Sequence, residues 1–177
     1  METPINTFES RIGQHTFKAR AHSLSVWFVL ALRLMMGYAF TYAGFEKIAN
    51  PFDASGYLLH AIPAESPLSG LFAWMGSTPW FVDFLNIAVP WGELFIGLAL
   101  IIGLLTRVAA FWGAFMMLMF YFSNWDIAHG YINGDFAYML VFLAVAAFGA
   151  GRILGLDALV ERHEIVQKYP ALKYLLG

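Results

Sequence analysis

Glu93 is an acidic residue in the middle of a long apolar segment, where a carboxylate needs a binding partner. The segment 84–106 is about 23 residues long and holds no other charged side chain. At ~1.5 Å per residue, a helix of this length crosses a hydrocarbon layer of ~30 Å. A carboxylate inside such a layer costs roughly 2.5–3.5 kcal/mol unless it is paired or protonated. The sequence therefore predicts a basic partner for Glu93 at the same depth in a membrane.

Arg33 is the partner that we expect. It is the single charged residue of the apolar segment 23–45. If the first helix enters the membrane near Ser25 and the second enters from the opposite side near Phe81, both charges lie ~12 Å from the same membrane face. Opposite charges at one depth avoid two separate burial penalties. We therefore predict an Arg33–Glu93 ion pair between two antiparallel neighbouring helices.

Small residues share a helix face with each of the two charges. Such residues let two helix backbones approach closely in a membrane. We therefore expect the helices to pack along these stripes, which are Arg33, Gly37, Thr41 and Gly44 on the first helix and Glu93 and Gly97 on the second.

Two interpretations of the predicted pair stay open. In one, the ion pair only holds two helices together. In the other, it lines a polar cavity that binds a quinone headgroup or relays protons. Aromatic side chains nearby would then serve either as stacking walls of this site or as ordinary core, and they are Tyr38, Phe40 and Trp91. A carboxylate next to an arginine stays ionised, which favours a fixed hydrogen-bond acceptor over a proton carrier.

A second polar group is expected at the outer membrane surface. Its candidate functional residues are Lys47, Asp83, Asp126 and His129. One histidine among carboxylates is typical of a solvated loop, so that we expect no metal site there. The imidazole of His129 titrates near neutral pH and could accept a proton when a quinol is oxidised.

The composition indicates an integral membrane protein. Of the 177 residues, 60% are hydrophobic and 12% are charged, and the mean hydropathy is +0.65, whereas soluble domains are typically about 45–50% apolar and about 25% charged. We predict an all-α bundle of four transmembrane helices in one membrane domain, 23–156, between a polar leader, 1–22, and an amphipathic tail, 157–177. The expected spans are about 23–47, 81–106, 108–125 and 136–156.

The connection between the first two spans is long, about thirty residues, and rich in Pro, Gly and Ser. A loop of this length favours a lid, a partner surface or an interfacial cap. Eight of the ten Lys and Arg residues lie on the side of the termini, Lys47 lies on the other side and Arg33 lies in the membrane. By the positive-inside rule, both termini are expected in the cytoplasm, with the chain in the plasma membrane and the long loop outside.

Several cofactors are not expected on this chain. It has no cysteine, and its five histidines all lie outside the predicted spans. Bis-histidine haem, iron–sulfur clusters and thiolate metal sites are therefore not expected. There is no glycine-rich nucleotide fingerprint, so that we expect no flavin, and nothing in the sequence indicates a nucleic-acid partner.

Three segments resemble a known membrane family. They are RLMMGYAFTYAGFEKI at 33–48, GELFIGLALIIGLLTRVAA at 92–110 and NGDFAYMLVFLAVAAFGAGRILGLDAL at 133–159. On these segments the chain resembles the DoxX family and, within it, the DoxD-like membrane subunits of thiosulfate:quinone oxidoreductase, also described as terminal quinol oxidase subunits. The motif positions in these segments are Gly37, Gly44, Gly97, Arg107, Arg152 and Asp157.

The resemblance implies a membrane subunit of a quinone-linked oxidoreductase, with quinone as a substrate and thiosulfate as the electron donor. Acidic residues outnumber Lys47 on the expected outer side, so that an anionic donor would be repelled there. We therefore expect a separate small subunit to handle the sulfur substrate while this chain handles quinone. The alternatives are a non-catalytic scaffold that assembles soluble redox partners and a small transporter, which a single fixed ion pair does not favour.

Overall fold

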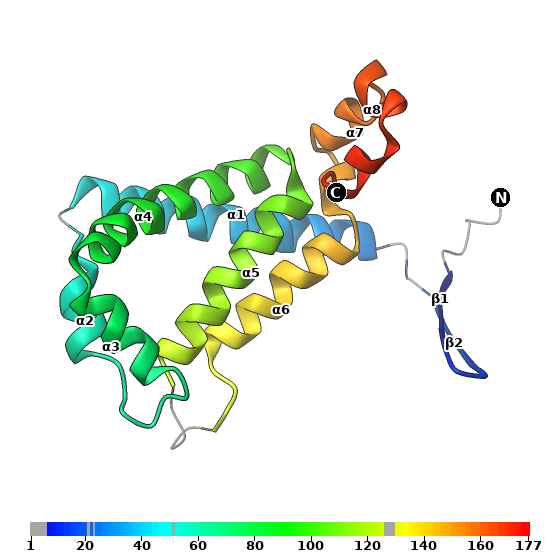
Figure 1. Cartoon of the computed structure of the whole chain (residues 1–177). Helices are drawn as coiled ribbons and strands as arrows, with labels where there is room; N and C mark the ends of the chain where they lie inside the picture. Colours follow the sequence, from blue (N-terminus) through cyan, green and yellow to red (C-terminus); the bar gives the residue numbers. More distant parts are fainter. Residues whose placement is uncertain (1–6, 21, 23, 51, 126–129) are drawn as a thin grey trace.

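The computed structural model describes residues 7–20, 22, 24–50, 52–125 and 130–177. Two predicted site residues, Asp126 and His129, lie outside the described residues. The main helices are α1 (Ser25–Ala49), α4 (Pro79–Ile102), α5 (Thr106–Ser123) and α6 (Gly134–Ala147). Figure 1 shows α1 and α4 side by side, with α5 and α6 running obliquely to them as a second pair.

Shorter elements lie at the two ends of this bundle (Figure 1). At one end, called the α2–α3 end below, are α2 (Ala54–His60) and α3 (Ser69–Ser77). At the other, the tail end, are η1 (Ala150–Arg152), α7 (Asp157–Val160), α8 (Glu164–Lys168) and η2 (Pro170–Tyr174). An antiparallel hairpin precedes α1 and consists of β1 (Thr7–Ile12) and β2 (His15–Arg20).

Helices α1, α4 and α5 are long and apolar enough to cross a membrane, and α6 is a shorter apolar helix. The predicted fourth helix, 136–156, is wrong in extent, because α6 ends at Ala147. Gly149 then takes a left-handed backbone conformation, with a φ of 61°, before η1 begins. Glycine adopts this conformation at little cost, which is why a helix stops here in spite of the apolar sequence that follows.

The predicted polar leader, 1–22, contains the β1–β2 hairpin. Thr7 pairs with Arg20 and Ile12 pairs with His15. Gly13, with a φ of 60°, lies in the tight turn between the strands. The β-branched and aromatic residues on both sides of this glycine favour strands, and a short turn at a glycine joins them.

Helices α1 and α4 approach closely because glycines lie at their contact. A Cβ atom on Gly44 would lie 2.7 Å from the carbonyl oxygen of Pro90. A Cβ atom on Gly97 would overlap with the backbone of Thr41. Since a side chain at either position would meet backbone atoms, the glycines determine how the two helices are aligned.

The alignment of α1 with α4 differs from the predicted one. Gly37 lies against Ile101, where a Cβ atom would be 3.1 Å from the backbone nitrogen. This antiparallel register places Arg33 beyond the end of α4, whereas the predicted register placed it opposite Glu93, a displacement of roughly 12 residues or ~18 Å. The predicted Arg33–Glu93 ion pair is therefore wrong. The close approach of the glycines, rather than an equal depth of the charges, aligns the two helices.

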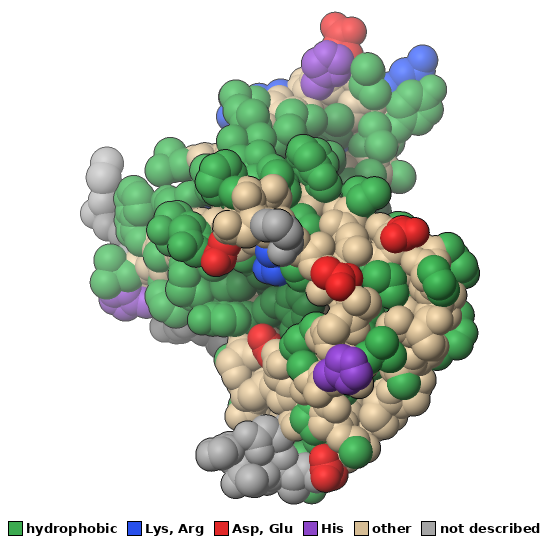
Figure 2. All heavy atoms as spheres, turned by 90° about the vertical axis from the view of Figure 1, so that its left-hand side faces the viewer, with side chains coloured by type: hydrophobic (Ala, Val, Ile, Leu, Met, Phe, Trp, Pro, Cys, Tyr) green, Lys and Arg blue, Asp and Glu red, His purple; other side chains and the backbone are tan. Residues whose placement is uncertain are grey.

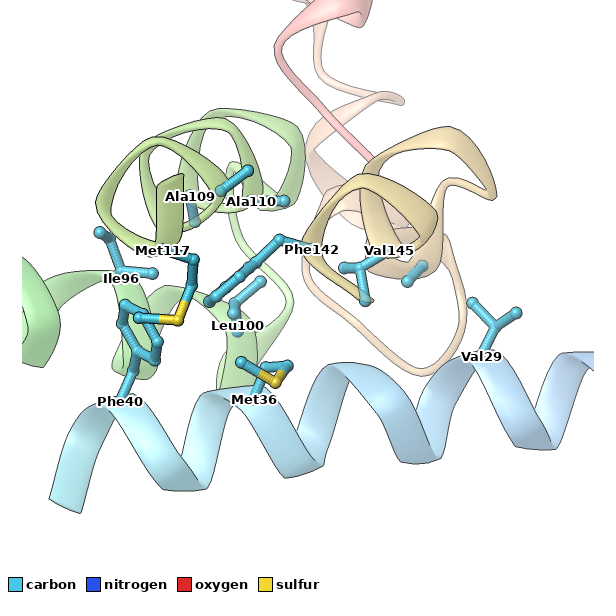
Figure 3. Packing of buried hydrophobic residues seen from close by; sticks show 12 residues of the cluster. Val29, Met36, Phe40, Ile96, Leu100, Ala109, Ala110, Met117, Phe142 and Val145 are labelled. Carbon is cyan, nitrogen blue, oxygen red and sulfur yellow. The ribbon is translucent and has the colours of Figure 1, made fainter. Parts of the chain in front are cut away.

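Buried side chains from α1, α4, α5 and α6 form one core (Figure 3). Phe142 of α6 is fully buried and packs edge to face against Phe40 of α1, with ring centroids 4.7 Å apart. Gly113 of α5 faces the same ring, and a Cβ atom there would overlap with it. Phe40, which we considered as a wall of the site, is therefore a core residue.

The predicted loop 49–79 is largely helical and is attached to the bundle. Helices α2 and α3 enclose a small second core made of Ala54, Leu58 and Phe72. The hydroxyl of Ser66, between the two helices, donates to the carbonyl oxygen of Phe122 in α5 at 2.7 Å. This segment is thus held against the α2–α3 end of the bundle.

Candidate functional site

Lys47 of α1 and Glu93 of α4 form an ion pair. The ammonium nitrogen Nζ of Lys47 lies 3.0 Å from Oε1 and 2.7 Å from Oε2 of Glu93. The Glu93 side chain is 3% exposed and the Lys47 side chain is 28% exposed. The carboxylate is thus enclosed by the helices, while the ammonium group extends from it toward the surface. Lys47 occupies the place that we predicted for Arg33.

An open cavity of about 410 Å³ lies next to this ion pair at the α2–α3 end. Figure 2, which views the molecule from that end, shows a hollow with basic atoms at its edge among hydrophobic side chains. The residues that line the cavity are Lys47, Ile48, Ala49, Asn50, Phe52, Asn86, Pro90 and Trp91. Lys47 is therefore the member of the ion pair that an occupant of the cavity would touch.

Within the described part of the chain, the Lys47 ammonium group has one hydrogen-bond donor left for such an occupant. An ammonium group has three N–H donors and no acceptor. Two of its hydrogen bonds go to the two oxygens of Glu93. Glu93 thus positions Lys47, and the remaining N–H can bind an oxygen atom of a molecule in the cavity.

Pro90 and Asn86 shape the wall of the cavity. Pro90 has no N–H, so that the carbonyl group of Asn86, four residues earlier, lacks its helical donor. The side-chain Oδ1 of Asn86 accepts a hydrogen bond from the Ala54 N–H at 2.8 Å. Asp53 caps α2 by accepting from the Ser55 N–H at 3.0 Å, and the hydrogen bond from the Ser55 hydroxyl lowers the pKa of the Asp53 carboxyl. These bonds tie the start of α2 to α4 beside the cavity.

Arg33 lies at the tail end and binds backbone rather than a carboxylate. Its Nη1 donates to the carbonyl oxygens of Ala150 at 2.5 Å and Ile153 at 2.8 Å, and its Nη2 donates to that of Leu154 at 3.4 Å. The Arg33 residue is 1% exposed. Since carbonyl groups in a turn after a helix lack helical donors, Arg33 satisfies groups that would otherwise be buried without a partner.

Asp157 holds the same region through three backbone N–H groups. Its Oδ1 accepts from Leu105 at 2.7 Å, and its Oδ2 accepts from Thr106 at 3.0 Å and from Gly177 at 2.9 Å. Leu105 has a left-handed φ of 50° in the turn between α4 and α5. The carboxylate therefore fixes this strained turn and caps the start of α5, where the first N–H groups have no helical acceptor.

We expect Asp157→Asn to lower the free energy of unfolding by about 2 kcal/mol, because an amide NH₂ group cannot accept the hydrogen bonds that one carboxylate oxygen accepts. The measurement is unfolding in detergent micelles followed by tryptophan fluorescence. Asp83→Asn, on an exposed side chain of α4, serves as the matched control. Equal stability of the two variants would contradict this role of Asp157.

The remaining predicted residues lie in separate places. Tyr38 is exposed on the outside of α1, where its ring stacks on Tyr42 with centroids 6.3 Å apart. Asp83 is exposed, and Arg107 donates from Nε to the carbonyl oxygen of Ala146 at 3.2 Å. Of the two aromatic residues proposed for the site itself, Trp91 lines the cavity and Tyr38 does not. Within the described residues, no three His, Asp or Glu side chains are grouped so as to hold a metal ion.

Comparison with known proteins identifies the family. The DoxX family model matches residues 28–126, which is more than half of the chain. The chain belongs to the DoxX family. DoxX proteins are membrane proteins and are often associated with quinone-linked oxidoreductases. No curated protein and no solved structure matches the chain.

The DoxX match contains the candidate site but not the tail. It begins in α1 and ends just after α5, so that Lys47, Glu93 and the cavity residues all lie within it. The third resembling segment, 133–159, and with it Asp157, lies outside the matched residues.

Sequence reasoning missed the Lys47–Glu93 pair of this DoxX protein, although a signal for it was present. Lys47 follows Gly44 by three residues and therefore lies on the same stripe of α1. Aligning the glycines of the two helices first, and only then searching for opposite charges, would have placed Lys47 rather than Arg33 beside Glu93.

Proposed function

We propose that this DoxX protein is the membrane subunit of a quinone-linked oxidoreductase and that the cavity beside Lys47 binds the quinone headgroup. One observation carries the proposal: an ammonium group, held by an enclosed carboxylate, lines an open cavity in a membrane helix bundle. The volume of about 410 Å³ is within the usual range of small-molecule sites, about 300–1,000 Å³.

The residues around the cavity fit the chemistry of a quinone. A quinone ring has apolar faces and two carbonyl oxygens, and it dissolves in the bilayer. Phe52 and Trp91 offer aromatic surface, while Lys47 offers a charged hydrogen-bond donor to one carbonyl oxygen. When the quinone accepts two electrons and two protons, negative charge develops on its oxygens, and a preorganised ammonium group stabilises that charge. Glu93 acts as a positioning residue that keeps Lys47 in place.

We further propose that thiosulfate is the electron donor and that a second, small subunit handles it. Between Arg33 and Arg107 the sequence contains a single Lys or Arg, Lys47, and Glu93 neutralises it. The α2–α3 end therefore has little to attract an anionic donor. In the proposed topology the protein lies in the plasma membrane, with the α2–α3 end facing outward and both termini facing the cytoplasm. The distribution of basic residues supports this orientation.

A neutral double variant tests the quinone site. Lys47→Met with Glu93→Gln removes both charges together and leaves no buried charge unpaired. We expect this variant to reach the wild-type level in membranes and to bind quinone about ten- to hundredfold more weakly, because a hydrogen bond to a charged group is worth about 1.5–3 kcal/mol. Binding is measured with a short-chain quinone analogue on the purified protein, and quinone reduction is measured in membranes at equal protein level.

The test of the quinone site has a control variant and a result that would contradict the proposal. Asp83→Asn removes a charge from the same helix outside the cavity and should leave quinone affinity unchanged. If the double variant folds and keeps the affinity of the wild type, the cavity is not a quinone site. The pair would then only join α1 to α4, as in a non-catalytic scaffold.

A further inference from the structure

The tail forms a loop that is fastened to the bundle at both of its ends. At its start, the backbone of Ala150 and Ile153 is held by the guanidinium group of Arg33. At its far end, the N–H of Gly177 donates to Asp157. The residues between these points, 158–175, include α8 and η2 and most of α7. Their position relative to the helices is therefore fixed by buried bonds.

This loop lies beside the helix bundle rather than on its axis. Figure 1 shows α7 and α8 displaced to one side at the tail end, in a direction roughly perpendicular to α1 and α4. Since α1 and α4 have the length and composition of membrane-spanning helices, their axes give the approximate direction of the membrane normal. The loop then lies at the level of the membrane surface, over lipid that surrounds the bundle.

The surface that the loop turns toward the membrane is apolar. Figure 2 looks along the bundle from the α2–α3 end, so that it shows the side of the loop that faces the bilayer. Hydrophobic side chains cover most of that side, and charged side chains lie at its edges. The exposed apolar residues of the tail include Leu154, Leu159, Ile165, Tyr169 and Tyr174. Water-facing surfaces rarely carry so large a contiguous apolar patch without a partner.

Basic side chains occur in the tail and at the adjoining start of α5. They are Arg107, Arg152, Arg162, Lys168 and Lys173. Arg152 pairs with Glu161 at 2.5 Å. The hydrogen bond from Arg152 lowers the pKa of the Glu161 carboxyl, and the charges of Lys173 and Arg107 lower it further. Glu161 therefore stays ionised. The five basic side chains outnumber the carboxylates of Glu161 and Glu164, while the carboxylate of Asp157 is buried among backbone N–H groups.

We propose that the tail, residues 154–175, is an interfacial element that binds the anionic lipid headgroups of the adjoining leaflet. Short helices with an apolar face and basic edges bind at the boundary between headgroups and acyl chains. Basic residues near an anionic surface add attraction. The apolar surface continues the lipid-facing surface of the bundle, which favours lipid over a protein partner. The element is independent of the quinone site, which lies at the opposite end of the bundle.

The absence of cysteine from the chain makes a direct test simple. Single cysteines at Leu159, Ile165 and Tyr174 are spin-labelled in the full-length protein, with Glu164→Cys as the control on a charged neighbour. The protein is placed in nanodiscs of phosphatidylcholine alone or with phosphatidylglycerol. Relaxation by oxygen reports on lipid, and relaxation by a water-soluble nickel complex reports on water. In the anionic discs, the labels at apolar positions should be accessible to oxygen and protected from nickel, and the label at 164 should show the reverse.

A charge variant tests the role of the headgroups. Replacing Arg162, Lys168 and Lys173 with Gln should weaken the binding of anionic headgroups by the tail about fivefold per residue, since each basic residue near such a surface contributes about 1 kcal/mol. The labels at the apolar positions should then become more accessible to nickel in anionic discs. If all labels remain as accessible to nickel as the label at 164 in both kinds of disc, the proposal is overturned and the apolar face belongs to a protein partner. Equal immersion in neutral and anionic discs would overturn the requirement for anionic lipid.

Discussion

Lys47→Met is expected to lower the free energy of unfolding by about 3–5 kcal/mol, because it leaves the carboxylate of Glu93 inside the bundle without its cation. Glu93→Gln should cost less. The Lys47 side chain is 28% exposed, so that its charge can reach water when the partner is lost, whereas the Glu93 side chain is 3% exposed and cannot. Unfolding in micelles, followed by tryptophan fluorescence, measures both variants.

Two further variants separate the ion pair from other effects at this position. Asp83→Asn, which removes an exposed charge from the same helix, should change stability by less than about 0.5 kcal/mol. The exchange Lys47→Glu with Glu93→Lys should recover part of the lost stability, yet it places a carboxylate at the cavity and should abolish quinone binding. A Lys47→Met variant as stable as Glu93→Gln would contradict the asymmetry of the pair.

The second large effect is expected for Gly97→Ala, which should lower the free energy of unfolding by about 3 kcal/mol or more. The added methyl group would overlap with the backbone nitrogen and the hydroxyl of Thr41, and neither helix can move without disturbing the contacts on both sides. Overpacking of this kind usually costs about 1–3 kcal/mol, and here it also separates the backbones that carry the Lys47–Glu93 pair. Both stability and quinone affinity should therefore fall.

Replacing Gly92 of α4 with alanine, five residues before Gly97, provides the control. Gly92 also lies in α4, but a Cβ atom there would meet only the sulfur of Met116, at a distance of 3.8 Å. Gly92→Ala should therefore leave the protein unchanged or stabilise it by up to about 1 kcal/mol, since alanine favours a helix more than glycine does. Equal effects at 92 and 97 would show that close packing at Gly97 does not hold α1 against α4.

The membrane class and the family could be predicted from the sequence because both depend on local features. An uninterrupted apolar segment of some twenty residues has few alternatives to a spanning helix, and α1, α4 and α5 have that character. The end of α6 was missed for a local reason as well. Composition favoured a longer helix, but the left-handed turn at Gly149 and the hydrogen bonds from Arg33 stabilise a different path.

The site could be predicted only in part, because it depends on the alignment of two helices. Glu93 was identified correctly as a buried carboxylate that needs a cation. Its partner was not, since the estimate of depth assumed that each helix begins at the membrane surface. The true partners of Arg33 are carbonyl groups more than a hundred residues away in the sequence, and no local pattern reveals such contacts.

The unequal lengths of the helices have a consequence for the lipid around the protein. Helices α1 and α4 have 25 and 24 residues, whereas α5 and α6 have 18 and 14. At ~1.5 Å per residue, α1 and α4 are roughly 36 Å long, whereas α5 and α6 are roughly 21–27 Å long. A bilayer adapts to a short apolar surface by becoming thinner. We therefore expect a thinner membrane beside α5 and α6, with lipids of shorter acyl chains on that flank of the protein.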